Sequence, residues 1–385
     1  MIRNNYILVN MRMSVRISIF LKATMLIAVI TSCRDRNNQD YLEYFTINAA
    51  ENRIEKLNSS HYIDTSEINI IRLETTEKSL FGEVTKLVRT ESRIFILDAT
   101  HAKCILIFDT AGNFQNSIGS IGRGPGELSY LLDFSVDPDE EYIIITDNTG
   151  KILKTDLEGN IIKESNLKWG SLTNVICHEG NIYGYTGSRA GMGNYQIIKL
   201  NSELDFEQAF LPFSSPLPGL FRNMNALYKF AEEVFFYSII DNCIYHLQDG
   251  IFVKRYYFDF GELNLTLNNS SSPEFPFGSE FAFLWNFVVE GDSIVLLSVF
   301  DDGRPWLSFL SKRDNELYTV TSVNEDLPGF SRPITHFKGM FISVCESSKF
   351  IEAFPLSDFS PKPEDNPLLI EYRIKADFNF ATPVF

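Results

Sequence analysis

Short apolar runs separated by polar turns recur along most of the chain. The clearest copy is 83-EVTKLVRTESRIFILDATHAKCILIFDTAGNFQNSIG-119, in which segments rich in β-branched and aromatic residues alternate with turn residues. The next copy, 131-LLDFSVDPDEEYIIITDNTGKILKTDLEGNIIKE-164, keeps this order and repeats the Asp-x-x-Gly-Asn turn. Runs of this length and composition are typical of β-strands, so both segments predict four-stranded units.

Weaker copies of the same unit follow in the rest of the chain, at residues 172–205, 225–258, 286–322 and 333–377. Six units of about 40 to 50 residues, each with three or four strands, predict an all-β fold, a six-bladed β-propeller. The early strand 67-EINIIRLE-74 lies outside the first full unit. We expect it to supply the outermost strand of the sixth blade, because this closes the ring and covers a free strand edge.

The glycine-rich stretch 119-GSIGRGPGEL-128 allows two interpretations, a phosphate-binding loop or a linker between blades. Phosphate loops of the P-loop type need Gly-Lys followed by Ser or Thr and a helix behind them. Here Arg123 is followed by Gly124, and the next residues predict strands. The stretch is therefore expected to be a linker, in which glycine supplies the positive φ that the corner needs.

The two clearest units resemble NHL-type repeats with their glycine linker. More closely, the segments 70-IIRLETTEKSLFGEVTKL-87, 94-IFILD-98, 119-GSIGRGPGEL-128 and 366-NPLLIEYRIK-375 resemble the 6-bladed β-propeller lipoproteins of Bacteroidota, an NHL-like or TolB-like propeller group. The resemblance covers nearly all of the chain after its N-terminal segment. It implies a propeller fold and a place in the cell envelope, and it implies no particular reaction.

The N-terminal segment has the pattern of a secretory signal. Basic residues precede the apolar run 23-ATMLIAVI-30, which is too short to span a bilayer and ends in 30-ITSC-33. This ending resembles a bacterial lipobox, which implies that Cys33 carries the lipid. We therefore expect a lipoprotein signal peptide at 1–32, a tether at 33–62 and the propeller at 63–385. The expected location is the cell envelope, with the lipid in the outer membrane on its periplasmic or surface face.

The charge of the chain limits its partners. The formal net charge is −16, and removal of residues 1–32 takes away four basic residues and no acidic one, which moves it to −20. A body this acidic is not expected to bind nucleic acid, or to contact the membrane except through its lipid anchor. We expect a monomer whose partner is an unidentified protein, peptide or glycan. The cysteines show no CxxC pair, so no zinc or redox motif is present in the sequence.

One polar position recurs near the start of the inner strand of successive blades. It is occupied by Asp133, Asn174, Asn225 and Asn286. Inner strands line the central channel of a propeller, so these side chains are expected to converge at one mouth. Carboxylate and amide oxygens suit Ca²⁺, which makes calcium the candidate cofactor, as in the propeller lactonases that this arrangement resembles. The alternative is that each residue forms a local turn with its own backbone.

Loops expected on the same face provide further candidate ligand contacts: Arg123, Glu127, Arg189 and Arg304. Arginine beside glycine-rich and aromatic residues is common where proteins recognise carboxylates, peptides or sugars. The alternative for Arg123 is an ion pair with Glu127 or with a neighbouring loop. These residues and the polar ring together form the predicted ligand site.

Two classes of function remain open from the sequence. The first is a lipid-anchored binding or scaffold module, which the lack of HExxH, GxSxG and EF-hand patterns favours. The second is a calcium-dependent hydrolase or lyase with its site at the channel mouth, which only the polar ring favours. No catalytic residue is assigned.

Overall fold

The computed structural model describes residues 44–168, 170–187, 195–212, 225–265, 281–327, 329–330, 332–354, 361–375, 378 and 380; the side chains of residues 286 and 287 are not described. Cys33 and the signal peptide lie outside these residues, as does Arg189. None of the helices in the described part of the chain has the length and apolarity that a bilayer crossing requires.

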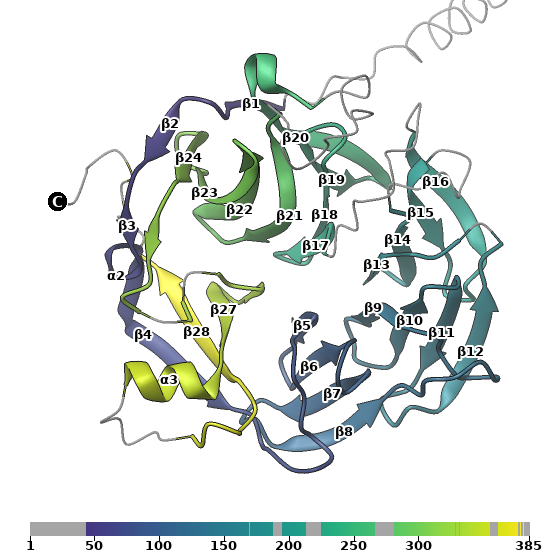
Figure 1. Ribbon diagram of the computed structural model, residues 1–385. Helices are drawn as coiled ribbons and strands as arrows, with labels where there is room; N and C mark the ends of the chain where they lie inside the picture. The colour runs from purple at the N-terminus through teal and green to yellow at the C-terminus, as the bar shows by residue number, and fades with distance from the viewer. Residues whose placement is uncertain are drawn as a thin grey trace, which may run out of the picture. The chain divides into compact units, whose positions relative to one another are not determined.

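Most of the described residues form six small sheets of mainly antiparallel strands around a central axis, a six-bladed β-propeller (Figure 1). Blade one contains β5 (Lys86–Arg89), β6 (Arg93–Asp98), β7 (Cys104–Asp109) and β8 (Phe114–Ile118). Blade two contains β9 (Leu131–Val136), β10 (Ile143–Asp147), β11 (Lys151–Thr155) and β12 (Ile161–Asn166). Blade three contains β13 (Asn174–His178), β14 (Asn181–Tyr185), β15 (Tyr195–Leu200) and β16 (Phe206–Pro212). The fold predicted from the strand rhythm is therefore confirmed.

The remaining blades follow the same order from the axis outwards. Blade four contains β17 (Leu227–Phe230), β18 (Glu233–Ser238), β19 (Cys243–Gln248) and β20 (Ile251–Asp259), followed by the short helix η1 (Gly261–Leu263). Blade five contains β21 (Phe283–Glu290), β22 (Ile294–Asp301), β23 (Arg304–Ser311) and β24 (Glu316–Val320). Blade six contains β26 (Thr335–Phe337), β27 (Met340–Cys345), β28 (Leu368–Ile374) and β4 (Ile63–Arg72), with α3 (Ser347–Ala353) between β27 and β28.

Blade six is completed by an N-terminal strand. β4 pairs antiparallel with β28, in a register that joins Arg72 to Leu368 and Ile63 to Ile374. The segment predicted to close the ring, residues 67–74, largely coincides with β4 and occupies the predicted outermost position. Both ends of the propeller are thus held in one sheet, which covers the edge of β28.

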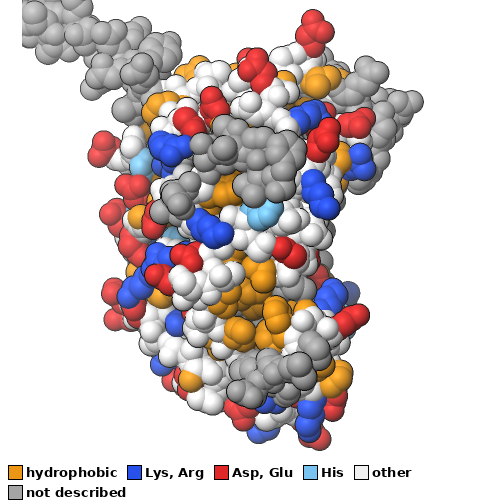
Figure 2. Space-filling view, turned by 90° about the vertical axis from the view of Figure 1, so that its left-hand side faces the viewer, with side chains coloured by type: hydrophobic (Ala, Val, Ile, Leu, Met, Phe, Trp, Pro, Cys, Tyr) orange, Lys and Arg blue, Asp and Glu red, His pale blue; other side chains and the backbone are white. Residues whose placement is uncertain are grey.

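The tether assigned to residues 33–62 requires a correction, because residues 44–62 are part of the propeller. Three short strands, β1 (Phe45–Asn48), β2 (Asn52–Ile54) and β3 (Leu57–Asn58), form a strap along the outer edges of the blades, and α2 (Ser59–Tyr62) leads into β4. β1 pairs parallel with β20, β2 with β24, and β3 with β25 (Val323–Asn324). Figure 2 shows the side of the propeller that carries β2, β3 and β4, where acidic and basic side chains are interspersed.

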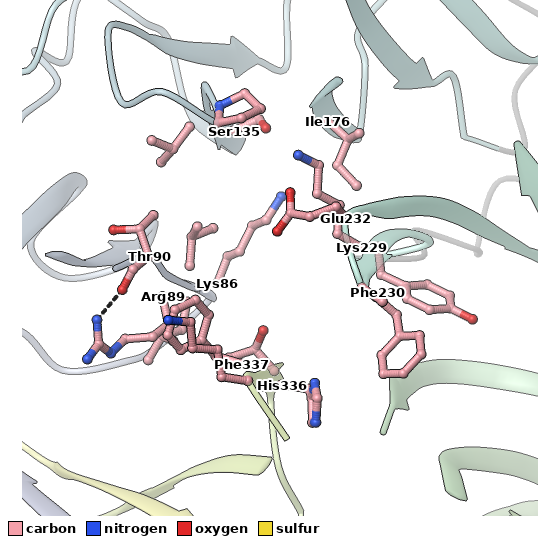
Figure 3. A pocket seen from close by; sticks show the side chains of 18 of the residues that line it. Lys86, Arg89, Thr90, Ser135, Ile176, Lys229, Phe230, Glu232, His336 and Phe337 are labelled. Atoms are coloured by element: carbon pink, nitrogen blue, oxygen red, sulfur yellow. Dashed lines mark hydrogen bonds between the residues drawn. The ribbon is translucent and has the colours of Figure 1, made fainter. Parts of the chain in front are cut away.

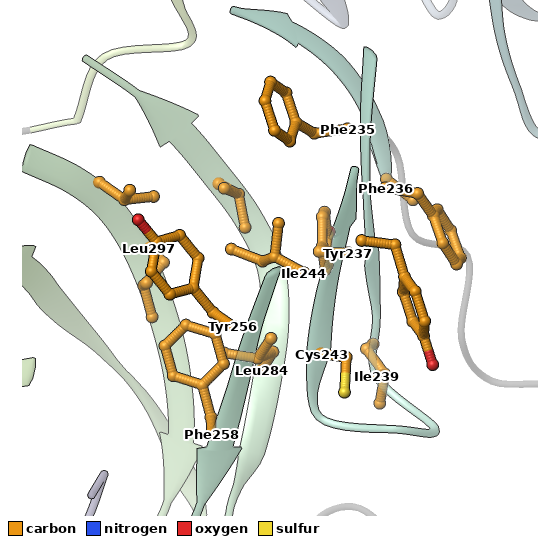
Figure 4. Close-up of a cluster of buried hydrophobic side chains, with 14 of the residues drawn as sticks. Phe235, Phe236, Tyr237, Ile239, Cys243, Ile244, Tyr256, Phe258, Leu284 and Leu297 are labelled. Carbon is orange, nitrogen blue, oxygen red and sulfur yellow. The ribbon is translucent and has the colours of Figure 1, made fainter. Parts of the chain in front are cut away.

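The core consists of apolar layers between neighbouring blades. Strands such as β9 and β10 are buried along their whole length because each blade packs against another on both faces, which explains their continuous apolar runs. Between blades four and five, Phe235, Ile244 and Tyr256 belong to one buried cluster with Leu284 and Leu297 (Figure 4). The four cysteines in the described part of the chain are free thiols, and all but Cys104 are buried.

The propeller places all six inner strands in one ring, in the order β5, β9, β13, β17, β21 and β26. Each inner strand begins after a linker from the preceding blade and ends in a hairpin to the second strand of its own blade. The channel therefore has a linker mouth, where the inner strands begin, and a hairpin mouth, where they end.

Candidate functional site

Two members of the predicted polar ring meet at the beginning of their inner strands. Asn174 Nδ2 donates to Asp133 Oδ2 at 2.7 Å, and the backbone N–H of Val175 donates to the same oxygen at 2.6 Å. Lys86 Nζ, from blade one, lies 2.8 Å from Asp133 Oδ1. Asp133 and Asn174 are 3% and 0% exposed, so the contacts lie in the interior. Asp133 thus joins the inner strands of blades one, two and three.

The network continues into blade four. Asn174 Oδ1 accepts a hydrogen bond from the backbone N–H of Leu227 at 2.5 Å. Burial raises the pKa of Asp133, and the positive charge of Lys86 opposes this rise. The oxygens of Asp133 therefore serve an ion pair and inter-blade hydrogen bonds, rather than only a turn of its own backbone.

The other two residues of the predicted polar ring are Asn225 and Asn286. Asn225 precedes β17 with a φ of 67° and lines the channel. Asn286 lies in β21, but its side chain is outside the described residues. In the part of the chain that the structure describes, no three His, Cys, Asp or Glu side chains gather as metal ligands. The calcium site stays a prediction.

The glycine stretch links β8 to β9, as expected for a linker between blades. Gly119 and Gly126 have φ angles of 126° and 72°, which favour glycine. Glu127 Oε2 accepts from the backbone N–H of Gly124 at 2.8 Å, so Glu127 fixes its own loop. Lys151 Nζ supports the loop by donating to the carbonyl oxygens of Gly124 and Glu127 at 3.0 and 2.8 Å.

Two of the arginines predicted as ligand contacts, Arg123 and Arg304, lie at loops on the linker side of the propeller. Arg123 is exposed and has no hydrogen-bond or ion-pair partner among the described residues, so the suggested pair with Glu127 is not formed. Arg304 is exposed at a turn of blade five, where its guanidinium lies 4.0 Å from the ring centre of Trp306. Arg123, Arg304 and Glu127 lie outside both of the cavities described next.

A cavity of about 920 Å³, here called the channel cavity, occupies the hairpin side of the channel. All six inner strands line it, through residues that include Lys86, Ser135, Ile176, Leu227, Val289 and His336. The hairpins that follow β5, β9, β17 and β26 surround its opening. The ligand site predicted at the linker mouth and the channel cavity thus lie at different ends of the inner strands. Lys86 and Asn225 line the channel cavity, although Lys86 also contacts Asp133 and Asn225 belongs to the predicted ring.

Aromatic and basic side chains from blades one and six form one wall of this cavity (Figure 3). The Arg89 guanidinium lies 5.2 Å from the ring centre of Phe337, and its Nη1 donates to the carbonyl oxygen of Thr90. His336 lies between Phe230 and Phe341, with ring centres 5.6 and 5.2 Å away. Burial lowers the pKa of His336 to about 4, so this imidazole is neutral at pH 7.

A buried ion cluster supports the wall formed by blades four and five. Glu290, whose side chain is fully buried, accepts from Tyr228 at 3.0 Å and from Arg255 at 2.8 Å. Lys312 Nζ also lies 2.5 Å from Glu290 and 4.0 Å from the ring centre of Phe230. Because each charge has partners, the cluster holds Tyr228 and Phe230 in fixed positions beside the cavity.

A second cavity of about 880 Å³, here called the side cavity, lies among the hairpins of blades two, three and four. Its lining includes His178, Glu179 and Tyr183 from blade three and Glu233 and His246 from blade four. Sequence reasoning missed both cavities, because their residues do not recur at one repeat position. The sequence feature that could have indicated these cavities is the number of carboxylates in the hairpins that follow the inner strands.

These observations define the class of protein as a six-bladed β-propeller with a ligand-sized cavity in its channel. The chain belongs to the family described as a domain of unknown function, DUF4934, which matches residues 44–375. No curated protein matches the sequence.

Two solved structures resemble this chain at low sequence identity. A protein of Bacteroides fragilis for which export is predicted has a TM-score of 0.67 and 18% identity, over 86% of this chain and all of that one. A DUF4221 family member from Bacteroides vulgatus has a TM-score of 0.49 and 11% identity, over 82% of this chain and 98% of that one. The first of these supports the propeller fold.

Proposed function

We propose that the protein is a lipid-anchored binding module of the cell envelope, whose ligand enters the channel cavity at the hairpin mouth. The observation that carries this proposal is a cavity of about 920 Å³ to which every inner strand contributes. A cavity of this size with apolar walls and a few polar groups is the usual form of a ligand site. The ligand is a protein segment, a peptide or a glycan.

The cellular location is part of the proposal. It rests on the apolar run 23–30 followed by ITSC, with Cys33 as the lipidated residue. The similar protein from Bacteroides fragilis, for which export is predicted, agrees with this location. Since the described residues begin at Tyr44 with the strap, residues 34–43 would be the tether between the lipid and the propeller.

Preorganisation of the cavity walls supports a binding role. Arg89 stacks on Phe337, and Glu290 is held between Arg255 and Lys312, so these side chains are fixed before any ligand arrives. Walls of this kind lower the entropy lost when a ligand binds.

Calcium-dependent hydrolysis is the alternative, favoured by the meeting of Asp133 and Asn174 at the start of the inner strands. A calcium ion would compete with Lys86 for the Asp133 carboxylate. If the ring binds calcium, added Ca²⁺ raises the melting temperature by mass action, and Asp133→Asn removes that rise.

The binding proposal is tested with an array of envelope glycans and peptides. Phe337→Ala removes an aromatic wall of the channel cavity, and Val88→Trp fills it. Both are expected to reduce binding of the captured ligand at least tenfold, whereas Arg304→Ala, outside both cavities, serves as the control and should not. Captured ligands that depend on Arg304 and ignore both cavity variants would contradict the proposal.

A further inference from the structure

We infer that the ligand of the channel cavity is a peptide segment with a Lys or Arg side chain, whose cationic group binds where the two cavities join. This inference rests on the proposed function, because it concerns the same cavity. The junction is defined by the residues that line both cavities: Asp137, Pro138, Asp139, Lys229, Ala231 and Glu232. Asp137, Pro138 and Asp139 come from the hairpin that follows β9, Lys229 lies in β17, and Ala231 and Glu232 lie in the hairpin between β17 and β18.

The central residue of the junction is Asp137, a buried carboxylate without a cationic partner. It is 8% exposed, accepts a hydrogen bond from the backbone N–H of Asp139 at 3.1 Å and is hydrogen-bonded by the neutral hydroxyl of Tyr142. No Lys, Arg or His of the described residues forms an ion pair with it. A buried carboxylate normally has a counter-charge, since desolvation of an unpaired charge is unfavourable. A cation from a ligand would supply that charge.

The basic side chains of the channel cavity do not fill this role, because five of the six already have carboxylate partners. These five pairs are Lys86 with Asp133, Arg89 with Glu371, Arg93 with Glu140, Lys338 with Glu91, and Arg373 with Glu67. The sixth, Lys229, is one positive charge at a junction that holds three carboxylates, those of Asp137, Asp139 and Glu232. The junction is therefore negative.

The side cavity extends the negative region. It adds Glu179, Glu233 and Asp249. His178 lies 3.9 Å from Glu179 and His246 lies 3.3 Å from Glu233. Burial lowers the pKa of both histidines, although the neighbouring carboxylates oppose this, so neither neutralises the region fully at pH 7. With a formal net charge of −16 for the chain, the protein field also favours the approach of cations.

A peptide fits these cavities better than a small cation does. The channel cavity beside the junction has apolar walls that include Ile176, Leu227 and Val288. A basic side chain at the junction with an apolar neighbour in the channel would use both surfaces, because apolar burial and charge pairing then act together. The side cavity leaves room for a second basic residue of the same segment.

The test uses two acetylated and amidated hexapeptides, one alternating Lys and Phe and the other alternating Glu and Phe. The parent protein is expected to bind the Lys peptide, with an affinity that falls as salt rises, and to bind the Glu peptide at least tenfold more weakly. The double variant Asp137→Asn, Glu232→Gln should weaken the Lys peptide at least tenfold. The matched control Asp302→Asn, Glu262→Gln removes two exposed carboxylates outside both cavities and should leave binding unchanged.

A third variant distinguishes a specific loss of binding in the double variant from a loss of folding. Lys229→Ala removes the one basic side chain of the junction and is expected to strengthen Lys-peptide binding several-fold, a gain that a damaged fold does not produce. Preference for the Glu peptide, or weaker Lys-peptide binding in K229A, would overturn the inference. If the parent prefers the Glu peptide and Phe337→Ala abolishes this binding, the channel cavity remains the ligand site. Only the inferred charge of the ligand is then wrong. Binding of neither peptide, with no junction-dependent ligand on the array, would also overturn the inference.

Discussion

Lys86 on the inner strand of blade one reaches Asp133 on the inner strand of blade two, with Nζ 2.8 Å from Oδ1. The side chains are 12% and 4% exposed, so the pair lies in the interior. The same carboxylate accepts hydrogen bonds from Asn174 and Val175 of blade three. One side chain thus connects three blades beneath the channel cavity, and its removal tests how the ring is held together.

Asp133→Asn keeps the shape of the side chain but leaves the Lys86 ammonium without its counter-charge. We expect the free energy of unfolding to fall by about 3 kcal/mol or more, the usual cost of breaking a buried ion pair on one side. Urea unfolding measures the change. Asp302→Asn at an exposed turn is the control and should stay within about 0.5 kcal/mol of the parent. Equal stability of the two variants would show that the contact between Lys86 and Asp133 does not stabilise the ring.

The pH dependence of stability should reflect Asp98, which lies at the end of β6. Burial opposes its ionisation, but hydrogen bonds from the backbone N–H groups of Gly82, His101, Ala102 and Thr100 outweigh this and lower its pKa to about 2. A lowered carboxyl pKa stabilises the fold above the unfolded-state value, and this stability is lost as the pH falls from about 4 towards 2.

The ionised carboxylate of Asp98 contributes about 2 kcal/mol to the free energy of unfolding at neutral pH. Asp98→Asn should therefore be less stable than the parent at pH 7, and the difference should narrow as the pH falls below 4. Urea titrations at pH 7, 4 and 3 measure this. A difference that stays constant over the whole pH range would argue against a titrating role for Asp98.

The strap and β4 should differ in how much they stabilise the propeller. Deletion of residues 41–58 removes the strap, including the buried Ile47 and Leu57, each worth about 1.5 to 3 kcal/mol of apolar burial. Deletion of residues 41–75 also removes β4, which exposes the edge of β28 and opens blade six. We expect the shorter deletion to lower the melting temperature and the longer one to abolish a single cooperative transition. A longer deletion that melts with the parent would refute closure by β4.

Cys33 should determine where the protein resides. In the proposed function Cys33 carries the lipid, so Cys33→Ala is expected to move the protein from the membrane fraction to the soluble fraction. Fractionation and labelling with a fatty-acid analogue measure both effects. Membrane association that persists without lipid labelling would contradict the assignment.

The sequence predicted the fold well because blade strands are buried on both faces and form continuous apolar runs, as in 94-IFIL-97 and 143-III-145. It also located the closing strand, since 67-EINIIRLE-74 had no place in the first unit. The strap was missed because FTIN, NRI and LN are too short to show a period, and Ile47 is the one buried residue of β1.

The site was harder to predict for a physical reason. A repeated polar position indicates side chains that converge on the axis, but it does not distinguish a ligand site from hydrogen bonding between blades. Asp133 and Asn174 do converge, and their polar atoms bind neighbouring strands. The cavity walls use unlike residues, such as Lys86, Ile176 and His336, at the inner strands of different blades, so no repeat position marks them.

The central claim is that the ligand binds in the channel cavity, and site-specific photo-crosslinking in intact cells tests it most directly. A photoreactive amino acid replaces Val88, which lines the cavity, or Arg304, which lies outside both cavities. Binding in the channel cavity is expected to give a covalent adduct of defined mass from position 88 and none from position 304. An adduct that forms from position 304 and not from position 88 would show that the ligand binds elsewhere.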